Sequence, residues 1–255
     1  MELYELLITT FVAALLTDLA TGLGAVPFFF VRDLSAKLEG AFTAAAGGMM
    51  IAASLIQLVG EALDRAPGHR AWEVALGITL GAAFFGAATR WLHTNEDFDF
   101  LGLRKKGGSA ALLIVVAMTL HSLPEGIAVG VGYGSSDTKL GFAVALAIAI
   151  HNIPEGVAIT LALRPKGVST LGCMGFAILT SVPQVIGAVP AAWAVWIFEP
   201  MLPAGMGFAA GAMTYLVVAE LLPEATDRAG KHLTPLAFIV GIVLMMLMGV
   251  AVGLG

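Results

Sequence analysis

Long apolar runs, separated by short polar connections, fill almost the whole chain of 255 residues. A run of about 20 apolar residues is long enough for one helix to cross a bilayer. The pattern predicts eight such helices, at about residues 4–30, 39–62, 72–92, 110–133, 139–163, 170–197, 203–224 and 232–254. We therefore expect an all-α polytopic membrane protein in which residues 1–255 form a single transmembrane domain.

The charged residues collect in the connections, and their distribution predicts the orientation of the chain. The connections after odd-numbered runs contain ten Lys and Arg residues, whereas those after even-numbered runs contain three. Because cytoplasmic loops are enriched in Lys and Arg, the odd-numbered connections should face the cytoplasm. Both termini should then lie outside, and the longest connection, about residues 93–109, should lie inside. We expect a multi-pass protein of the plasma or inner membrane.

Composition agrees with this interpretation and narrows it. Hydrophobic residues make up 58% of the chain and charged residues only 12%, about half the charged share of an ordinary soluble domain. A single cysteine, Cys173, excludes a disulfide framework within the chain and a cysteine-rich metal site. We expect the lipid bilayer as a partner and no nucleic acid.

One six-residue word occurs twice, thirty residues apart, inside two of the apolar runs: His121-Ser-Leu-Pro-Glu-Gly126 and His151-Asn-Ile-Pro-Glu-Gly156. Ionisable side chains inside a membrane are costly and usually functional. In a helix, residues four apart share a face, so each His lies beside its Glu. Imidazole nitrogens and carboxylate oxygens together suit a divalent cation. The repeated word therefore predicts metal binding.

The two words also match in depth and in backbone chemistry. Pro124 and Pro154 cannot donate a backbone hydrogen bond, so each helix should kink and leave a carbonyl unpaired. Gly126 and Gly156 should let a neighbouring helix approach closely. Both words lie roughly 15–18 Å from the outer surface at 1.5 Å per residue, near the bilayer midplane. The sequence thus predicts a midplane metal site on kinked helices four and five, with His121, Glu125, His151 and Glu155 as ligands. The alternative is that these groups only neutralise each other between packed helices.

These residues resemble the ZIP (Zrt-, Irt-like) family of divalent-metal transporters, and the resemblance covers the whole chain. The family is similar in its eight spans, outward termini, variable cytoplasmic loop after the third span, and H-N-x-P-E-G motifs on the fourth and fifth. Residues 47–54 resemble the family's G-x-M-x-x-A-S stretch. That likeness implies Met50 as a further ligand, although an ordinary apolar contact is the alternative for it.

The resemblance implies transport of Zn²⁺, or of Fe²⁺, Mn²⁺ or Cd²⁺, toward the cytoplasm, with no resident cofactor and no enzymatic activity. Helices four and five would expose the site alternately to each side. An intramembrane metalloenzyme such as a hydrolase is the main alternative, and a metal-gated channel or sensor is a weaker one. Whether the chain forms a homodimer is left open.

The chain departs from the family pattern where a second metal would bind. The matching positions are Ser122, Asn152 and Gln184, all neutral and weak as ligands. We therefore expect one strong metal position and a second that is polar and mostly empty. Gln184 has an equal alternative, which is a hydrogen bond between helices.

Other polar residues interrupt the apolar runs. Gln57, Glu61 and Asp64 step along one side of the second run toward the outside and are candidates for an entry route. Glu220 and Glu224 near the cytoplasmic end of the seventh run are candidates for an exit route, although such carboxylates are more often simply solvated. Asp18, with Thr17 and Thr21, should bond a neighbouring helix, and a role in proton coupling is the alternative for it.

Overall fold

Helices account for all the regular structure that the described residues contain. The computed structural model describes residues 2–30, 34–66, 71–94, 119, 122–135, 138–164 and 167–252. Six helical stretches in these ranges are long and apolar enough to cross a membrane, so the prediction of an all-α polytopic membrane protein is confirmed. The last stretch, Glu199–Ala251, is too long for one crossing of a core about 30 Å thick. Most of residues 95–121, where the fourth run was expected to begin, lie outside the described residues, so the count of eight stays a prediction.

The observed helices follow the expected apolar runs closely. Two of them, α7 and α2, begin at a serine N-cap whose hydroxyl accepts a backbone N–H, Ser169 and Ser35 respectively. The bounds are α1 Leu3–Leu23, a 3₁₀ turn Val26–Phe29, α2 Ala36–Ile51, a π-helical segment Ala52–Leu58, α3 Val59–Arg65, α4 Ala71–Thr94, a helix at 122–134, α6 Thr138–Leu163, α7 Thr170–Ile197, a 3₁₀ turn Glu199–Met201, α8 Leu202–Leu216, a π-helical segment Val217–Leu221 and α9 Leu222–Val252.

The end of the seventh run differs from the expected boundary at residue 224. Helical structure continues five residues further, and the break comes at Gly230, whose φ of 82° and ψ of 165° are accessible essentially only to glycine. The extra turn has an electrostatic reason. It places the Arg228 guanidinium 2.8 Å from Glu224 on its own helix and 2.9 Å from Glu39 on α2.

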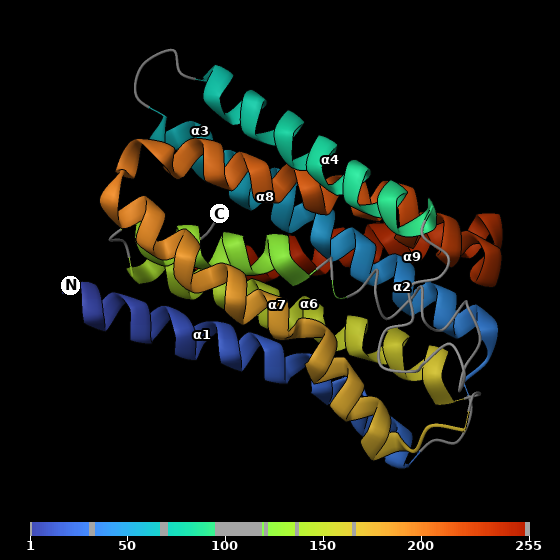
Figure 1. Ribbon diagram of the computed structural model, residues 1–255. Coiled ribbons are helices and arrows are strands. Elements are labelled where there is room, and N and C mark those ends of the chain that lie inside the picture. The colour runs from blue at the N-terminus through green and yellow to red at the C-terminus, as the bar shows by residue number, and fades with distance from the viewer. Residues whose placement is uncertain are drawn as a thin grey trace.

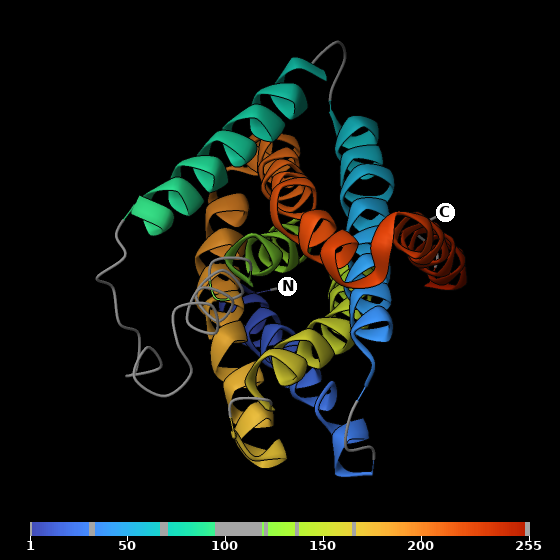
Figure 2. The same ribbon diagram turned by 90° about the vertical axis from the view of Figure 1, so that its right-hand side faces the viewer.

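The helices form two bundles (Figure 1). In the first bundle, α1 packs on α6 and α7, and helix 122–134 packs on α7. In the second bundle, α2 packs on α9, and α4 packs on α8. Contacts of α6 with α2 join the two bundles. Helix 122–134, drawn in green, lies near the centre of the arrangement (Figure 2) and is almost entirely buried. The exposed large hydrophobic side chains of α1, α4, α7 and α9 form the surface that would face lipid.

Glycines bring helix backbones together inside the first bundle. Gly126, Gly130 and Gly134 lie four apart on helix 122–134, and a Cβ on any of them would press into the backbone of α7. Similarly, a Cβ on Gly156 of α6 would overlap the Thr21 carbonyl oxygen of α1. Small residues that repeat at this spacing are typical of close helix packing in membranes. The predicted role of Gly126 and Gly156 in close helix approach is therefore confirmed.

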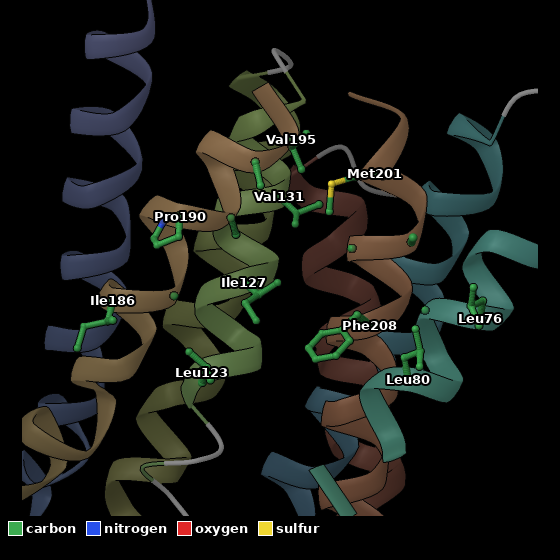
Figure 3. A pocket seen from close by; sticks show the side chains of 16 residues that line it. Leu76, Leu80, Leu123, Ile127, Val131, Ile186, Pro190, Val195, Met201 and Phe208 are labelled. Carbon is green, nitrogen blue, oxygen red and sulfur yellow. The ribbon is translucent and has the colours of Figure 1, made fainter. Parts of the chain in front are cut away.

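An apolar cavity of about 590 Å³ separates the two bundles over part of their length. Side chains of helix 122–134 and α7, such as Ile127 and Pro190, line it on one side (Figure 3). Side chains of α4 and α8, such as Leu80 and Phe208, line it on the other. Among the described residues, no charged or hydrogen-bonding side chain contributes to the lining. The seam between the two bundles is therefore apolar along this cavity.

Candidate metal site

Three of the four predicted motif ligands are described, and all three are buried in the first bundle. Glu125 on helix 122–134 is 0% exposed, and His151 and Glu155 on α6 are 1% and 4% exposed. The Nε2 atom of His151 lies 2.9 Å from Oε1 of Glu125, so the two motifs meet across the interface of their helices. The fourth predicted ligand, His121, lies outside the described residues.

Glu155 is the most unusual of these groups. It lies close enough to His151 and Glu125 for their charges to interact, yet neither of its carboxylate oxygens has a hydrogen-bond partner in the described part of the chain. An ionised carboxylate can only accept hydrogen bonds or bind cations, and a buried acceptor left without a partner costs free energy. This arrangement is suited to a cation that approaches Glu155.

The residues of the predicted second position are also buried, and two of them bond across helices. Gln184 of α7 donates from Nε2 to Oε2 of Glu125 at 2.8 Å. Asn152 of α6 donates from Nδ2 to Oε1 of Gln184 at 3.2 Å and to the Thr17 carbonyl of α1 at 3.0 Å. The interhelical hydrogen bond considered for Gln184 is therefore confirmed. Ser122 is buried on the same helix as Glu125.

The described residues do not yet form a closed coordination shell. Among them, no group of three or more His, Cys, Asp or Glu side chains is close enough to hold one ion. Met50 is buried in the main apolar cluster. The ligand set of His121, Glu125, His151, Glu155 and Met50 stays a prediction.

The candidate entry and exit residues are already engaged in local contacts. Gln57 lies in the π-helical segment Ala52–Leu58 and donates to the Met245 carbonyl at 3.5 Å. Glu61 forms an ion pair with Arg65, and Asp64 is exposed. At the other end, Glu224 pairs with Arg228, and Glu220 is half-buried in the segment Val217–Leu221. Their role in an ion route stays a prediction.

Sequence reasoning missed part of this arrangement. It gave the α1 polar residues no specific partner, yet the backbone of Thr17 accepts from Asn152, and Thr21 accepts a 2.8 Å hydrogen bond from Ser181. Oδ1 of Asp18 has no hydrogen-bond partner among the described residues, so the expected bond of Asp18 to a neighbouring helix stays a prediction. The two π-helical segments were not anticipated either. Such segments often occur at functional sites, but no residue pattern in the chain marks them.

Comparisons with known proteins point to one family. The family model described as ZIP Zinc transporter matches residues 101–249, which include both motifs. The chain is 34% identical over 249 residues to the zinc transporter GufA of Myxococcus xanthus, covering 95% of this chain and 98% of that protein. It is 35% identical over 247 residues to the zinc transporter ZIPB of Bordetella bronchiseptica, covering 92% of this chain and 78% of that protein.

A longer relative also matches. A protein of Arabidopsis thaliana is 39% identical over 211 residues, which are 82% of this chain. Those residues make up only 33% of that relative. The chain thus spans nearly the whole of some relatives and about a third of this one.

Proposed function

This chain belongs to the ZIP zinc transporter family, and from that premise we propose that it carries a divalent metal ion, zinc foremost, across the membrane toward the cytoplasm. The bacterial relatives GufA and ZIPB are zinc transporters, which supports zinc over Fe²⁺, Mn²⁺ or Cd²⁺. The family is one of transporters rather than enzymes, so the hydrolase alternative is set aside.

One observation carries the proposal: an excess of buried acceptors beside His151. Neither oxygen of Glu155 nor Oδ1 of Asn152 has a hydrogen-bond donor in the described residues. Burying an unpaired carboxylate costs on the order of several kcal/mol. A divalent ion held by imidazole and carboxylate groups would remove that cost, and His121, Glu125, His151 and Glu155 are its proposed ligands.

The bond between His151 and Glu125 has a specific consequence for ion binding. Nε2 of His151 and Oε1 of Glu125 share one hydrogen bond. A metal ion on Nε2 requires that nitrogen to be deprotonated, so an ion would take the place of the shared proton between the same two residues. The contact between His151 and Glu125 therefore keeps both groups at the position where an ion would bind.

Alternating access is the mechanism that the arrangement of the helices supports best. All the proposed ligands on helix 122–134 and α6 belong to the first bundle, whose helices are tied by backbone contacts at glycines. The apolar cavity marks a seam along which the first bundle meets α4 and α8. We propose that the first bundle exposes the ion to either side by moving along this seam against the second.

The membrane topology is part of the same proposal. Eight crossings, with both termini outside and residues 93–109 in the cytoplasm, follow from the distribution of Lys and Arg. The break at Gly230 supports two crossings within Glu199–Ala251. We also propose that the protein lies in the plasma or inner membrane and that residues 1–255 form a single domain.

Uptake into proteoliposomes tests the proposal. Zinc uptake by the purified protein should saturate with zinc concentration, and Fe²⁺, Mn²⁺ and Cd²⁺ should be compared as competitors. His151→Ala and Glu155→Gln should abolish uptake, because each removes a ligand that no neighbour replaces. Glu5→Gln, on the exposed first turn of α1, is the matched control and should transport normally.

Two measurements complete the test. Thermal melting should show that His151→Ala and Glu155→Gln remain folded. Uptake that either variant leaves unchanged would contradict the proposed site, and flux that never saturates would indicate a pore instead of a carrier.

A further inference from the structure

A chain of hydrogen bonds links α1 to Glu125 through two buried amides. It begins at the backbone carbonyl of Thr17, which accepts from Nδ2 of Asn152 at 3.0 Å. The same nitrogen donates to Oε1 of Gln184 at 3.2 Å, and Nε2 of Gln184 donates to Oε2 of Glu125 at 2.8 Å. The chain therefore crosses all four helices of the first bundle.

The direction of this chain is set by chemistry. A backbone carbonyl can only accept, so Asn152 must turn its NH₂ group toward Thr17. Its two hydrogens are then used on Thr17 and Gln184, and Gln184 must turn its oxygen toward Asn152. The NH₂ group of Gln184 is left facing Glu125. Reversing the Gln184 amide would set its oxygen against a carboxylate and its nitrogen against a nitrogen.

A second donor supports the same orientation of Gln184. The Thr17 hydroxyl lies 3.2 Å from Oε1 of Gln184 and 2.7 Å from the Ala14 carbonyl. Its single hydrogen bonds one of them at a time, and both are acceptors. Oε1 of Gln184 thus accepts from Nδ2 of Asn152 on α6 and, when the Thr17 hydroxyl turns away from Ala14, from Thr17 on α1 as well.

We propose that Gln184, held by Asn152 and Thr17, limits the site to one divalent ion and positions Glu125 for it. This inference rests on the proposed function. The Gln184 amide bonds Oε2 of Glu125, the oxygen that does not face His151, and it supplies an N–H donor there without adding charge. Gln184 is therefore a positioning residue that sets the metal stoichiometry.

Charge balance supports a single ion. Glu125 and Glu155 carry two negative charges when ionised, which match one divalent cation. A second such ion would leave two positive charges uncompensated inside the membrane, where isolated charges are costly. With a carboxylate at position 184, two divalent ions would leave one positive charge uncompensated instead of two. That carboxylate would also face Glu125 directly, so a cation between the two would be favoured.

Gly126 makes the contact with Gln184 possible. It follows Glu125 directly, and a Cβ on it would overlap the carbonyl oxygen of Gln184. The backbones of helix 122–134 and α7 are therefore in close contact at the level where the Gln184 side chain reaches Glu125. The glycine in the repeated motif thereby positions the carboxylate beside it.

Metal analysis of the purified, full-length protein loaded with zinc tests the proposal. The wild type should bind one zinc ion per chain and Gln184→Glu should bind two. Gln184→Leu, which removes the donor without adding charge, should still bind one ion, with an affinity lower by about ten- to a hundredfold. Thr180→Val is the matched control on α7, since within the described part of the chain the Thr180 hydroxyl bonds only to Ala177 of its own helix. It should bind like the wild type.

The outcomes separate this inference from the proposed function. A wild type that transports zinc but binds two ions would overturn the inference alone, as would a Gln184→Glu variant that folds and binds one. A wild type that binds no zinc would overturn the proposed function. Should Gln184→Glu fail to fold, X-ray absorption of the zinc-loaded wild type decides. A zinc–zinc distance of about 3.5–4 Å would refute a single ion, and its absence would support one.

Discussion

The substitution Gly126→Ala should damage the site without touching a ligand. The new methyl group would overlap the Gln184 carbonyl oxygen, whereas such carbon–oxygen approaches are normally about 3.3–3.6 Å. Helix 122–134 must therefore move away from α7 by on the order of 1 Å. The hydrogen bond from Gln184 to Glu125, now 2.8 Å, would then exceed the usual limit of about 3.2 Å.

The expected magnitude has two parts. Overpacking a tight interior contact costs about 1–3 kcal/mol, and losing a hydrogen bond to a charged group costs about 1.5–3 kcal/mol. The free energy of unfolding should thus fall by roughly 2.5–6 kcal/mol. With 2–4 °C per kcal/mol for a chain of this size, the melting temperature should fall by on the order of 10 °C. Zinc affinity should fall as well, because Glu125 loses its fixed orientation.

Thermal melting and zinc binding of the purified protein measure both effects. The matched control is Gly175→Ala on α7, where a Cβ would meet no atom within 4 Å. That variant should be as stable as the wild type, or slightly more stable because alanine favours the helix. If Gly126→Ala melts and binds zinc like Gly175→Ala, the close contact does not hold Glu125 in place and the reasoning is refuted.

Two further substitutions test the end of the second bundle that contains Arg228 and Gly230. Arg228→Ala removes the ion pairs to Glu224 and Glu39 and should lower the free energy of unfolding by about 1 kcal/mol, an effect that high salt reduces. Thermal melting measures this loss of stability, with a substitution of the exposed Lys231, Lys231→Ala, as the control. Equal stability of the two variants would argue against a stabilising role for the ion pairs of Arg228. Gly230→Ala forces an alanine into a glycine-only conformation and should cost about 1–3 kcal/mol. Gly60→Ala, with no atom within 4 Å of the added Cβ, is its control, and equal melting temperatures would show that the break tolerates a side chain.

The sequence predicted those features that depend on local periodicity or on chemical type. Apolar runs marked the helices, and the repeated His and Glu at one spacing marked the residues that meet in the core. Gly126 and Gly156 were predicted to be helix contact positions, because a glycine within an apolar helix lets a neighbouring helix approach closely. These inferences need no knowledge of which helix lies beside which.

Features that depend on the arrangement of distant helices could not be derived. Thr17 and Gln184 are 167 residues apart, and no periodicity connects a hydroxyl of α1 with an amide of α7. The helix past residue 224 depends on the contact of Arg228 with Glu39 in another helix. From the sequence alone, without knowledge of the contact with Glu39, a polar run containing Asp227 and Arg228 predicts a loop.

The glycine contacts allow neighbouring helices within a bundle only a few discrete positions along each other. At each contact, a glycine lies against a backbone carbonyl of the neighbouring helix, and no Cβ fits between them. If one helix slides by a fraction of a turn, the Cβ of another residue clashes with that carbonyl. Gly126, Gly130 and Gly134 repeat every four residues, so the next register that fits lies about 6 Å away along the helix axis. Helices within a bundle therefore have no stable arrangement at smaller displacements. Any smaller shift of the ion along the membrane normal must come from movement of the two bundles relative to each other.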